Sequence, residues 1–278
     1  MTWHITEDAA AFRSEAAGYF AADPARSTML LTISEGALRR PLAFTRYGWW
    51  TEPEGSRVTG AFLLTRRDEP ALGPMPETAA RALAHVLPDV TEVRAVRGEE
   101  ETAEAFAGEL CRGSGRSWTT TRRMRLHRLG GLTPPDPAPP GRARRAGVAD
   151  IPLAAEWMRH YARDIGEDGD VDYTPNIEAR VAEGRLHLWE TEDAGPVSMA
   201  GVTPVVAGQA RISSVFTLAE RRGRGYAAAV TTAVSRTALD EGAEQVLLFT
   251  DVANPTSNAL YRRLGYRPVI DHVGLTLS

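Results

Sequence analysis

The stretch Val215–Ala228 reads VFTLAERRGRGYAA and predicts a strand, a glycine-containing turn and a helix in immediate succession. The apolar segment Arg211–Leu218 is expected to be the strand, and the helix is expected to run from about Gly225 to Glu241. Glycine is needed where main chain approaches a ligand without a Cβ in the way. The first turn of a helix also offers unpaired N–H groups and a partial positive charge. The stretch therefore predicts an anion-binding turn at the carboxyl end of a strand.

The ligand that this turn favours is a pyrophosphate. The main-chain amides of Arg222–Ala227 are expected to converge on it, and Arg221, Arg222 and Arg224 add positive charge. A glycine turn covered by surface arginines, with no ligand, is the competing interpretation.

A dinucleotide site is a second alternative, because Gly223, Gly225 and Ala228 also fit the pattern GxGxxA. Six residues separate Phe216 from Gly223, whereas a dinucleotide turn follows its strand closely. No acidic residue ends a second strand about 20 residues further on, and too little chain remains for a doubly wound sheet. These features count against the dinucleotide interpretation.

A second informative segment, Leu248–Pro268, reads LFTDVANPTSNALYRRLGYRP. An apolar strand ends at Asp251, and Pro255 is suited to the first position of a helix. Asn258 and Tyr261 are three residues apart, so they share a helix face with Ser257. This polar face predicts either a ligand-facing surface or an ordinary capped surface helix, and the segment alone favours neither.

Taken together, the two segments resemble the GCN5-related N-acetyltransferase (GNAT) superfamily over about Arg142–Ser278. The family's phosphate motif, (Q/R)xxGx(G/A), is matched by Arg222, Gly225 and Ala227. Its following motif, NxxAxxLYxxxGF, is matched by Asn254, Leu260, Tyr261 and Gly265, with Ser257 in place of alanine and Tyr266 in place of phenylalanine.

The resemblance implies an α/β fold with a central mixed sheet, in which two parallel strands, here Arg211–Leu218 and Val246–Thr250, splay apart and admit acetyl-CoA. It implies direct acetyl transfer to the primary amine of a small molecule, with Tyr261 as the general acid that protonates the departing CoA thiolate. The residues that it places against coenzyme A are Val215, Phe216, Thr217, Arg222, Gly223, Arg224, Gly225, Tyr226, Ala227, Asn254 and Ser257.

The proline-rich segment Gly130–Gly141, GGLTPPDPAPPG, predicts a stiff interdomain linker. It divides the chain into an N-terminal domain over residues 1–129 and a catalytic domain over residues 142–278. The N-terminal half has a similar order of strands and helices, so we expect a degenerate, non-catalytic GNAT-like domain there. Its corresponding stretch, Arg66–Ala79, lacks the phosphate motif. A recognition surface formed by Trp49, Trp50 and Phe62 is the competing role for this half.

Composition excludes several kinds of chemistry. The chain has 278 residues, a formal net charge of −4 and one cysteine, so it forms no intrachain disulfide and suits neither nucleic-acid wrapping nor a cysteine-ligated metal. All 32 basic residues are arginines, which excludes a Schiff-base or P-loop lysine. The histidines lack metal-ligand spacing, so we expect no metal. The alanine and arginine bias fits a GC-rich bacterial genome. With no apolar leader or membrane span, a cytoplasmic monomer or homodimer is expected.

The acceptor and its base remain open at the sequence level. The acidic loop Asp164–Asp172 would favour a cationic amine if it borders the acceptor site, and a solvated loop without that role is the preferred interpretation. Glu190, Asp251 and His160 are candidate bases, beside a water chain or capture of the neutral amine. A CoA-binding sensor or regulatory module without catalysis is the rival class of function.

Overall fold

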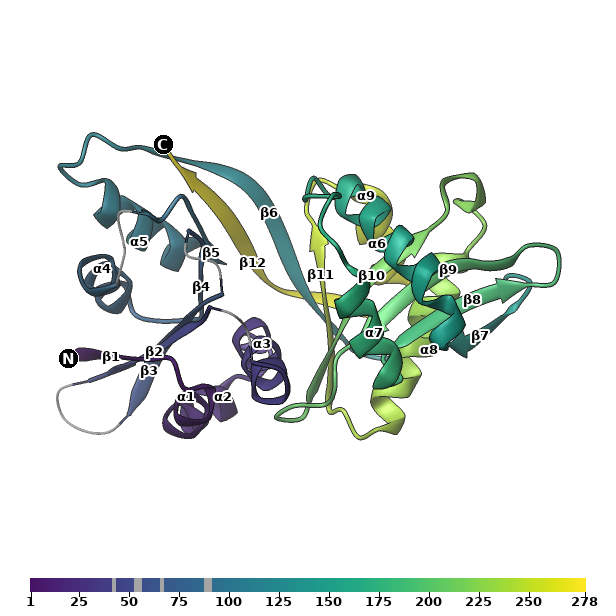
Figure 1. Ribbon diagram of the computed structural model, residues 1–278, viewed down its shortest axis with the longest axis horizontal. Coiled ribbons are helices and arrows are strands. Elements are labelled where there is room, and N and C mark those ends of the chain that lie inside the picture. The colour runs from purple at the N-terminus through teal and green to yellow at the C-terminus, as the bar shows by residue number, and fades with distance from the viewer. Residues whose placement is uncertain (42–43, 53–56, 66–67, 88–91) are drawn as a thin grey trace. The chain divides into compact units, whose positions relative to one another are not determined.

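The computed structural model describes residues 1–41, 44–52, 57–65, 68–87 and 92–278. The chain divides into two compact units. The N-terminal unit comprises Met1–Leu126, Thr250–Asn254 and Pro268–Ser278, and the C-terminal unit comprises His127–Phe249 and Pro255–Arg267. Helices flank a mixed sheet in each unit, as Figure 1 shows, so the expected mixed α/β fold is confirmed.

In the N-terminal unit the strands lie in the order β1-β2-β3-β4-β5-β12-β6, and β4 and β5 pair in parallel. Trp50 and Phe62 are buried, and the half-buried Trp49 stacks on His4. These aromatic residues therefore pack mainly against other residues of the unit. Arg66 and Arg67, the start of the stretch compared with the phosphate motif, lie outside the described residues. The elements of this unit are β1 (Thr2–Thr6), α1 (Ala9–Glu15), α2 (Ala17–Ala22), α3 (Thr28–Arg39), β2 (Arg46–Thr51), β3 (Val58–Leu64), β4 (Pro70–Leu72), α4 (Glu77–Val86), β5 (Ala95–Glu99), α5 (Glu100–Cys111) and most of β6 (Trp118–Leu129) and β12 (Tyr266–Leu277).

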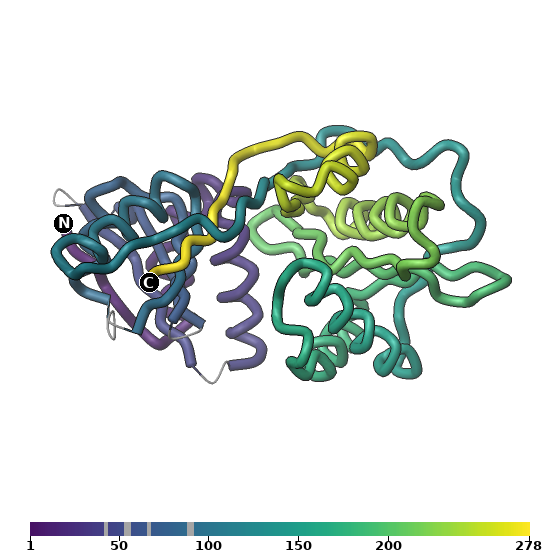
Figure 2. Tube along the Cα trace, turned by 90° about the horizontal axis from the view of Figure 1, so that it is seen from above, coloured from purple at the N-terminus to yellow at the C-terminus, as the bar shows by residue number. Residues whose placement is uncertain are grey.

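In the C-terminal unit the strands lie in the order β7-β8-β9-β10-β11, and only the β10–β11 pair among the described strands of this unit is parallel. Helix α8 covers one face of this sheet, and α6 and α7 cover the other (Figure 2). One buried cluster joins α8 and α9 to the sheet, and a second joins α6 and α7 to it. The elements are β7 (Arg142–Arg145), α6 (Ile151–Asp164), α7 (Thr174–Ala182), β8 (Leu186–Thr191), β9 (Gly195–Val202), β10 (Gln209–Thr217), α8 (Tyr226–Asp240), β11 (Gln245–Asp251) and α9 (Pro255–Arg263), with short 3₁₀ turns at Val148–Asp150 and Ala219–Arg221.

Strand β12 departs from the expected division of the chain. Its later part pairs antiparallel with β5, from His272 opposite Glu99 to Thr276 opposite Ala95. Residues 268–278 therefore belong to the N-terminal unit, although the sequence assigned all of 142–278 to the catalytic domain. The physical reason is that main-chain pairing between segments so far apart leaves no trace in local periodicity.

The proline-rich segment packs within the C-terminal unit instead of running free between domains. The N–H of Gly130 donates to the carbonyl of Gly265 at 3.0 Å, and that of Thr133 donates to Leu264 at 3.0 Å. The indole N–H of Trp189 donates to the Pro140 carbonyl at 3.0 Å. Gly265 has a φ of +102°, and a Cβ on it would lie 1.9 Å from the Gly131 carbonyl oxygen. Glycine at position 265 is therefore what allows the segment to approach the end of α9.

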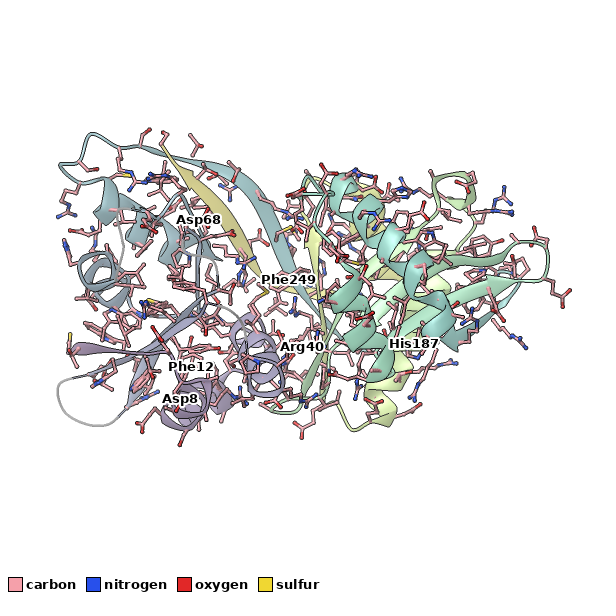
Figure 3. All side chains as sticks on the ribbon, viewed as in Figure 1. Asp8, Phe12, Arg40, Asp68, His187 and Phe249 are labelled. Carbon is pink, nitrogen blue, oxygen red and sulfur yellow. The ribbon has the colours of Figure 1, made fainter. Side chains whose placement is uncertain are left out.

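His187 of β8, labelled in Figure 3, lies between the sheet and α8. It is 5% exposed, and one ring nitrogen lies 3.3 Å from the hydroxyl of Thr237 on α8. Burial lowers its pKa to about 4, with the nearby Arg145 acting in the same direction. The ring is therefore neutral in the folded protein at neutral pH.

Candidate active site

Strands β10 and β11 part at their carboxyl ends. They pair in parallel from Gln209 opposite Gln245 to Ile212 opposite Leu248, and no pair follows in the described register although both strands continue. On the other side of β10, the register with β9 shifts between Ser213 and Phe216. Ser214, inside this bulge, has a φ of +54°. The parting therefore lies where the resemblance implied a gap between two parallel strands.

The last residues of β10 are anchored from the β9 side. The Ser198 hydroxyl donates to the Phe216 carbonyl at 2.7 Å and lies 2.9 Å from the Thr217 hydroxyl. Phe216 and Thr217 are buried, and Val215 is half-buried. This segment is thus fixed in position while its β11 side lacks a neighbouring strand in the described register.

The turn before α8 presents main chain with little side chain over it. Gly223 and Gly225 have φ values of +77° and +84°, a region that glycine adopts without strain. Gly225 is the N-cap residue of α8, and no side chain bonds to the helix's first amides. A Cβ on Gly223 would meet nothing within 4 Å, and one on Gly225 would lie 3.7 Å from Pro139. Of the neighbouring site candidates, Ala227 is half-buried and the Tyr226 side chain is buried in the unit.

The three arginines of the turn differ in their partners. The Arg222 guanidinium contacts the Asp164 carboxylate at 2.5 Å and donates to the Thr217 carbonyl at 3.1 Å. Arg221 pairs with Asp193 at 3.2 Å. Arg224 is exposed and has no carboxylate within 4.0 Å among the described residues. Arg222 therefore holds the turn to the ends of α6 and β10, and Arg224 leaves its charge uncompensated.

Tyr261 of α9 lies in the core on the α8 side of the sheet and is 8% exposed. Its ring meets that of Tyr266 edge to face, with centroids 6.0 Å apart. Burial raises the pKa of the Tyr261 phenol, and the phenols of Tyr161 and Tyr266 raise it further. The Tyr261 side chain shares a buried cluster with Ile212 of β10 and Leu248 of β11, the last pair before these strands part, and burial there disfavours the phenolate. The Tyr261 phenol therefore stays protonated at neutral pH.

The two remaining site candidates flank the start of α9. Asn254 is exposed, and its N–H donates to the Asp251 carbonyl at 3.1 Å. It ends the segment Thr250–Asn254 that is counted with the N-terminal unit. Ser257, in the first turn of α9, is half-buried and belongs to the C-terminal unit.

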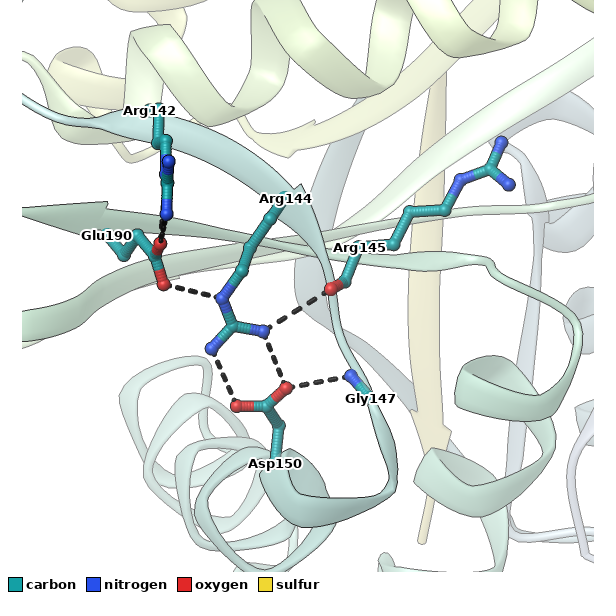
Figure 4. A network of polar contacts seen from close by, with 6 residues as sticks. All are labelled: Arg142, Arg144, Arg145, Gly147, Asp150 and Glu190. Atoms are coloured by element: carbon teal, nitrogen blue, oxygen red, sulfur yellow. Dashed lines mark hydrogen bonds and ion pairs between the residues drawn. The ribbon is translucent and has the colours of Figure 1, made fainter.

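Glu190 is bound into an arginine network, shown in Figure 4. Its carboxylate contacts Arg142 at 3.0 Å and Arg144 at 2.5 Å. Arg144 also pairs with both carboxylate oxygens of Asp150, at 2.6 and 2.8 Å, and so ties β7 and β8 to the start of α6. These hydrogen bonds from Arg144 and Arg142 lower the pKa of Glu190. The arrangement indicates a structural carboxylate rather than a proton acceptor.

The other candidate bases also have local contacts. A carboxylate oxygen of Asp251 accepts the N–H of Ala253 at 2.7 Å. The His160 ring is exposed, 6.2 Å from the ring of Phe216. These contacts leave the base unassigned.

The acidic loop uses its carboxylates locally. Besides the Asp164–Arg222 pair, Asp170 contacts Arg163 at 3.2 Å, and Asp168 accepts the N–H of Asp170 at 2.8 Å. Asp172 accepts the N–H of Thr174 at 2.9 Å, and hydrogen bonds to Thr174 lower the pKa of Asp172. These contacts order the loop and the start of α7.

Sequence reasoning missed Arg180 of α7, which shares a helix face with the buried Ile177. Its guanidinium donates to the hydroxyl of Ser214 in the β10 bulge at 2.9 Å. The spacing of three residues from Ile177 was the available signal, because it turns an arginine toward the sheet. Among the described residues no cluster of potential metal ligands occurs, and no helix is long and apolar enough to cross a membrane.

Comparison with known proteins gives a family match within the C-terminal unit and solved structures that are similar over nearly the whole chain. Residues 152–266 match the model of the acetyltransferase (GNAT) family. A search of curated proteins gives no significant match. Solved structures similar over nearly the whole chain are a GNAT-family acetyltransferase from Colwellia psychrerythraea (11% identity, 100% of this chain and 99% of that one, TM-score 0.61) and a GCN5-related N-acetyltransferase from Sphaerobacter thermophilus (18%, 99% and 95%, TM-score 0.63). A third is a tandem GNAT protein from the clavulanic acid biosynthesis pathway (12%, 100% and 98%, TM-score 0.57).

At these identities the solved structures establish the fold alone, and they extend it over both units. The family match covers the parted strands, the glycine turn and Tyr261. Residues 152–266 of this chain therefore form an acetyltransferase domain of the GNAT family.

Proposed function

We propose that the C-terminal unit transfers an acetyl group directly from acetyl-CoA to the primary amine of a small molecule. One observation carries the proposal: β10 and β11 part beside an uncapped helix N-terminus, and a buried, protonated phenol lies near the parting. Helix N-termini of this kind bind phosphate groups. The residues present thus fit acetyl-CoA.

The turn before α8 would hold the pyrophosphate. Its amides from Gly223 to Ala227 supply N–H donors, and Arg224 supplies an uncompensated positive charge. Arg222 would hold the turn in position rather than bind the phosphates, because its guanidinium is bonded to Asp164 and Thr217. The parted edge of β10, at Val215–Thr217, would pair with the pantetheine arm, and Asn254 and Ser257 would contact its lower part.

In the transfer, the acceptor nitrogen forms a bond to the thioester carbon and the carbon–sulfur bond breaks. The ammonium proton goes to solvent or to a base. The thiolate takes its proton from Tyr261, whose elevated pKa keeps that proton in place until a charge develops on sulfur. General acid assistance of this kind contributes roughly 10²–10⁴ in rate.

A CoA-binding module without catalysis is the rival function, and a thiol-release assay with a panel of amines separates the two. Binding itself is tested with Gly225→Val. The valine adds a branched side chain at the turn and strains a φ of +84°, so the affinity for coenzyme A in calorimetry should be lost.

The matched control is Gly242→Val. Gly242 has a φ of +89° and follows the other end of α8, and a Cβ there meets nothing within 4 Å. It imposes the same backbone strain away from the turn, so the affinity should stay normal. Equal affinity in the two variants would refute the phosphate-binding role of the turn.

A further inference from the structure

Arg180 is a charged group without a charged partner. Its guanidinium carries five N–H donors. Among the described residues, the Ser214 hydroxyl is the one group that accepts a hydrogen bond from it. No carboxylate of the described residues lies within 4.0 Å of it, whereas seven arginines of this unit, Arg221 and Arg222 among them, have such a partner. Enclosing a charge without a counter-charge costs free energy, so such a residue usually has a use.

The surroundings shape a place for this guanidinium. A Cβ on Gly201 of β9 would lie 2.8 Å from its Nη1 atom, so glycine at that position leaves room for the group. Ser214 has a φ of +54°, and the bulge of β10 places its hydroxyl against the same atom. The side chain retains some accessible surface, although the protein around it lowers its pKa by desolvation. The guanidinium is thus held in a fixed position, has no carboxylate among the described residues to neutralise its charge, and remains partly accessible to a ligand.

The guanidinium also lies near the proposed reaction centre. The phenol of Tyr161 is close enough to raise the pKa of Arg180 and also that of Tyr261. Arg180 belongs to α7 on one face of the sheet, and Tyr261 belongs to α9 on the other. Arg180 bonds to Ser214 in the bulge of β10, beyond the last residue that pairs with β11, so its guanidinium lies beside the parting of the two strands.

We propose that Arg180 binds a carboxylate on the acceptor, so that the acceptor is an amino acid or a related amine with an acidic group. The planar guanidinium matches a carboxylate in two parallel hydrogen bonds, which would hold the amine at a fixed distance from the thioester. The carboxylates of the acidic loop that have described partners are already engaged, so they do not oppose an anionic acceptor. This proposal rests on the proposed acetyl transfer.

The test measures KM for the twenty common L-amino acids and for their carboxamides, with concentrations expressed as neutral amine. Wild-type protein should prefer the acid to its amide. Arg180→Met should raise KM for the acid roughly 10- to 100-fold, the effect of a hydrogen bond to a charged group, and should leave KM for the amide and for acetyl-CoA unchanged. Gly201→Ala, which displaces the guanidinium without removing it, should raise KM for the acid by a smaller factor.

Arg236→Met is the matched control, because Arg236 is exposed on α8, and its KM values should equal those of the wild type. A merely structural Arg180 would weaken acid and amide alike. Equal KM for acid and amide in the wild type, or acetylation confined to amines without a carboxylate, would overturn this proposal while acetyl transfer stands. Failure of the protein to bind coenzyme A would overturn the proposed function and, with it, the role of Arg180.

Discussion

Tyr261 and Tyr266 are buried in the C-terminal unit with their ring centroids 6.0 Å apart. Substituting each in turn separates the loss of the general acid from a disturbance of the core around it. Tyr261→Phe removes one oxygen and keeps the ring. The Tyr261 hydroxyl has no hydrogen bond to another described residue, so the free energy of unfolding should change by less than about 1 kcal/mol. If this phenol protonates the thiolate, kcat should fall by roughly 10²–10⁴ while the affinity for coenzyme A is retained.

Tyr266→Phe should give the opposite result. The Tyr266 and Ser235 hydroxyls lie 2.7 Å apart, and the Ser235 hydroxyl donates a hydrogen bond to the Thr231 carbonyl. Losing this bond should cost about 1 kcal/mol, or roughly 2–4 °C in Tm, with little change in kcat.

Single-turnover thiol release and thermal unfolding, measured on both variants, give the two readouts. A Tyr261→Phe enzyme with wild-type kcat would refute the general-acid role. A fall in kcat that is equal in both variants would show that the core, rather than the proton, was disturbed.

Two further predictions concern the turn and the effect of pH. Arg222→Met removes the contacts with Asp164 and Thr217 that hold the glycine turn, so the affinity for coenzyme A should fall about tenfold in calorimetry; unchanged affinity would contradict this anchoring role. His187 has its pKa lowered to about 4, below the ordinary value near 6.5, so its protonation favours the unfolded chain: stability should be full above pH 6.5 and should fall by up to about 3 kcal/mol toward pH 4. His187→Gln should reduce this loss in urea titrations at pH 7 and 4.5, and an identical loss in the variant would contradict the assignment.

The sequence predicted those parts of the site that are local in the chain. The strand, the two glycines and the helix of Val215–Ala228 need only neighbouring residues to specify them, and the structure contains each of them. The same holds for α9, which starts at Pro255 and ends at Arg263, before Gly265.

What the sequence could not show depends on contacts between distant segments. The pairing of β12 with β5 and the packing of the proline-rich segment against Leu264 and Gly265 have no periodic signature. The Glu190 network depends on Arg142 and Arg144 lying opposite it on a neighbouring strand. Arg180 left a local signal in its spacing from Ile177, but only the bulge at Ser214 gives that arginine a position.

The membership of β12 in the N-terminal unit bears on how the protein can be cut. A gene cut within the codons for residues 130–141 would give a first fragment that lacks β12, the strand that borders β5. A fragment ending near residue 129 would then expose the main-chain N–H and C=O groups of β5, and such open strand borders invite aggregation. A protease nick in that segment should instead leave a non-covalent complex whose halves copurify until denaturant releases them. Ending the gene at the proline-rich segment would therefore not yield a complete N-terminal unit, because that unit includes residues 268–278.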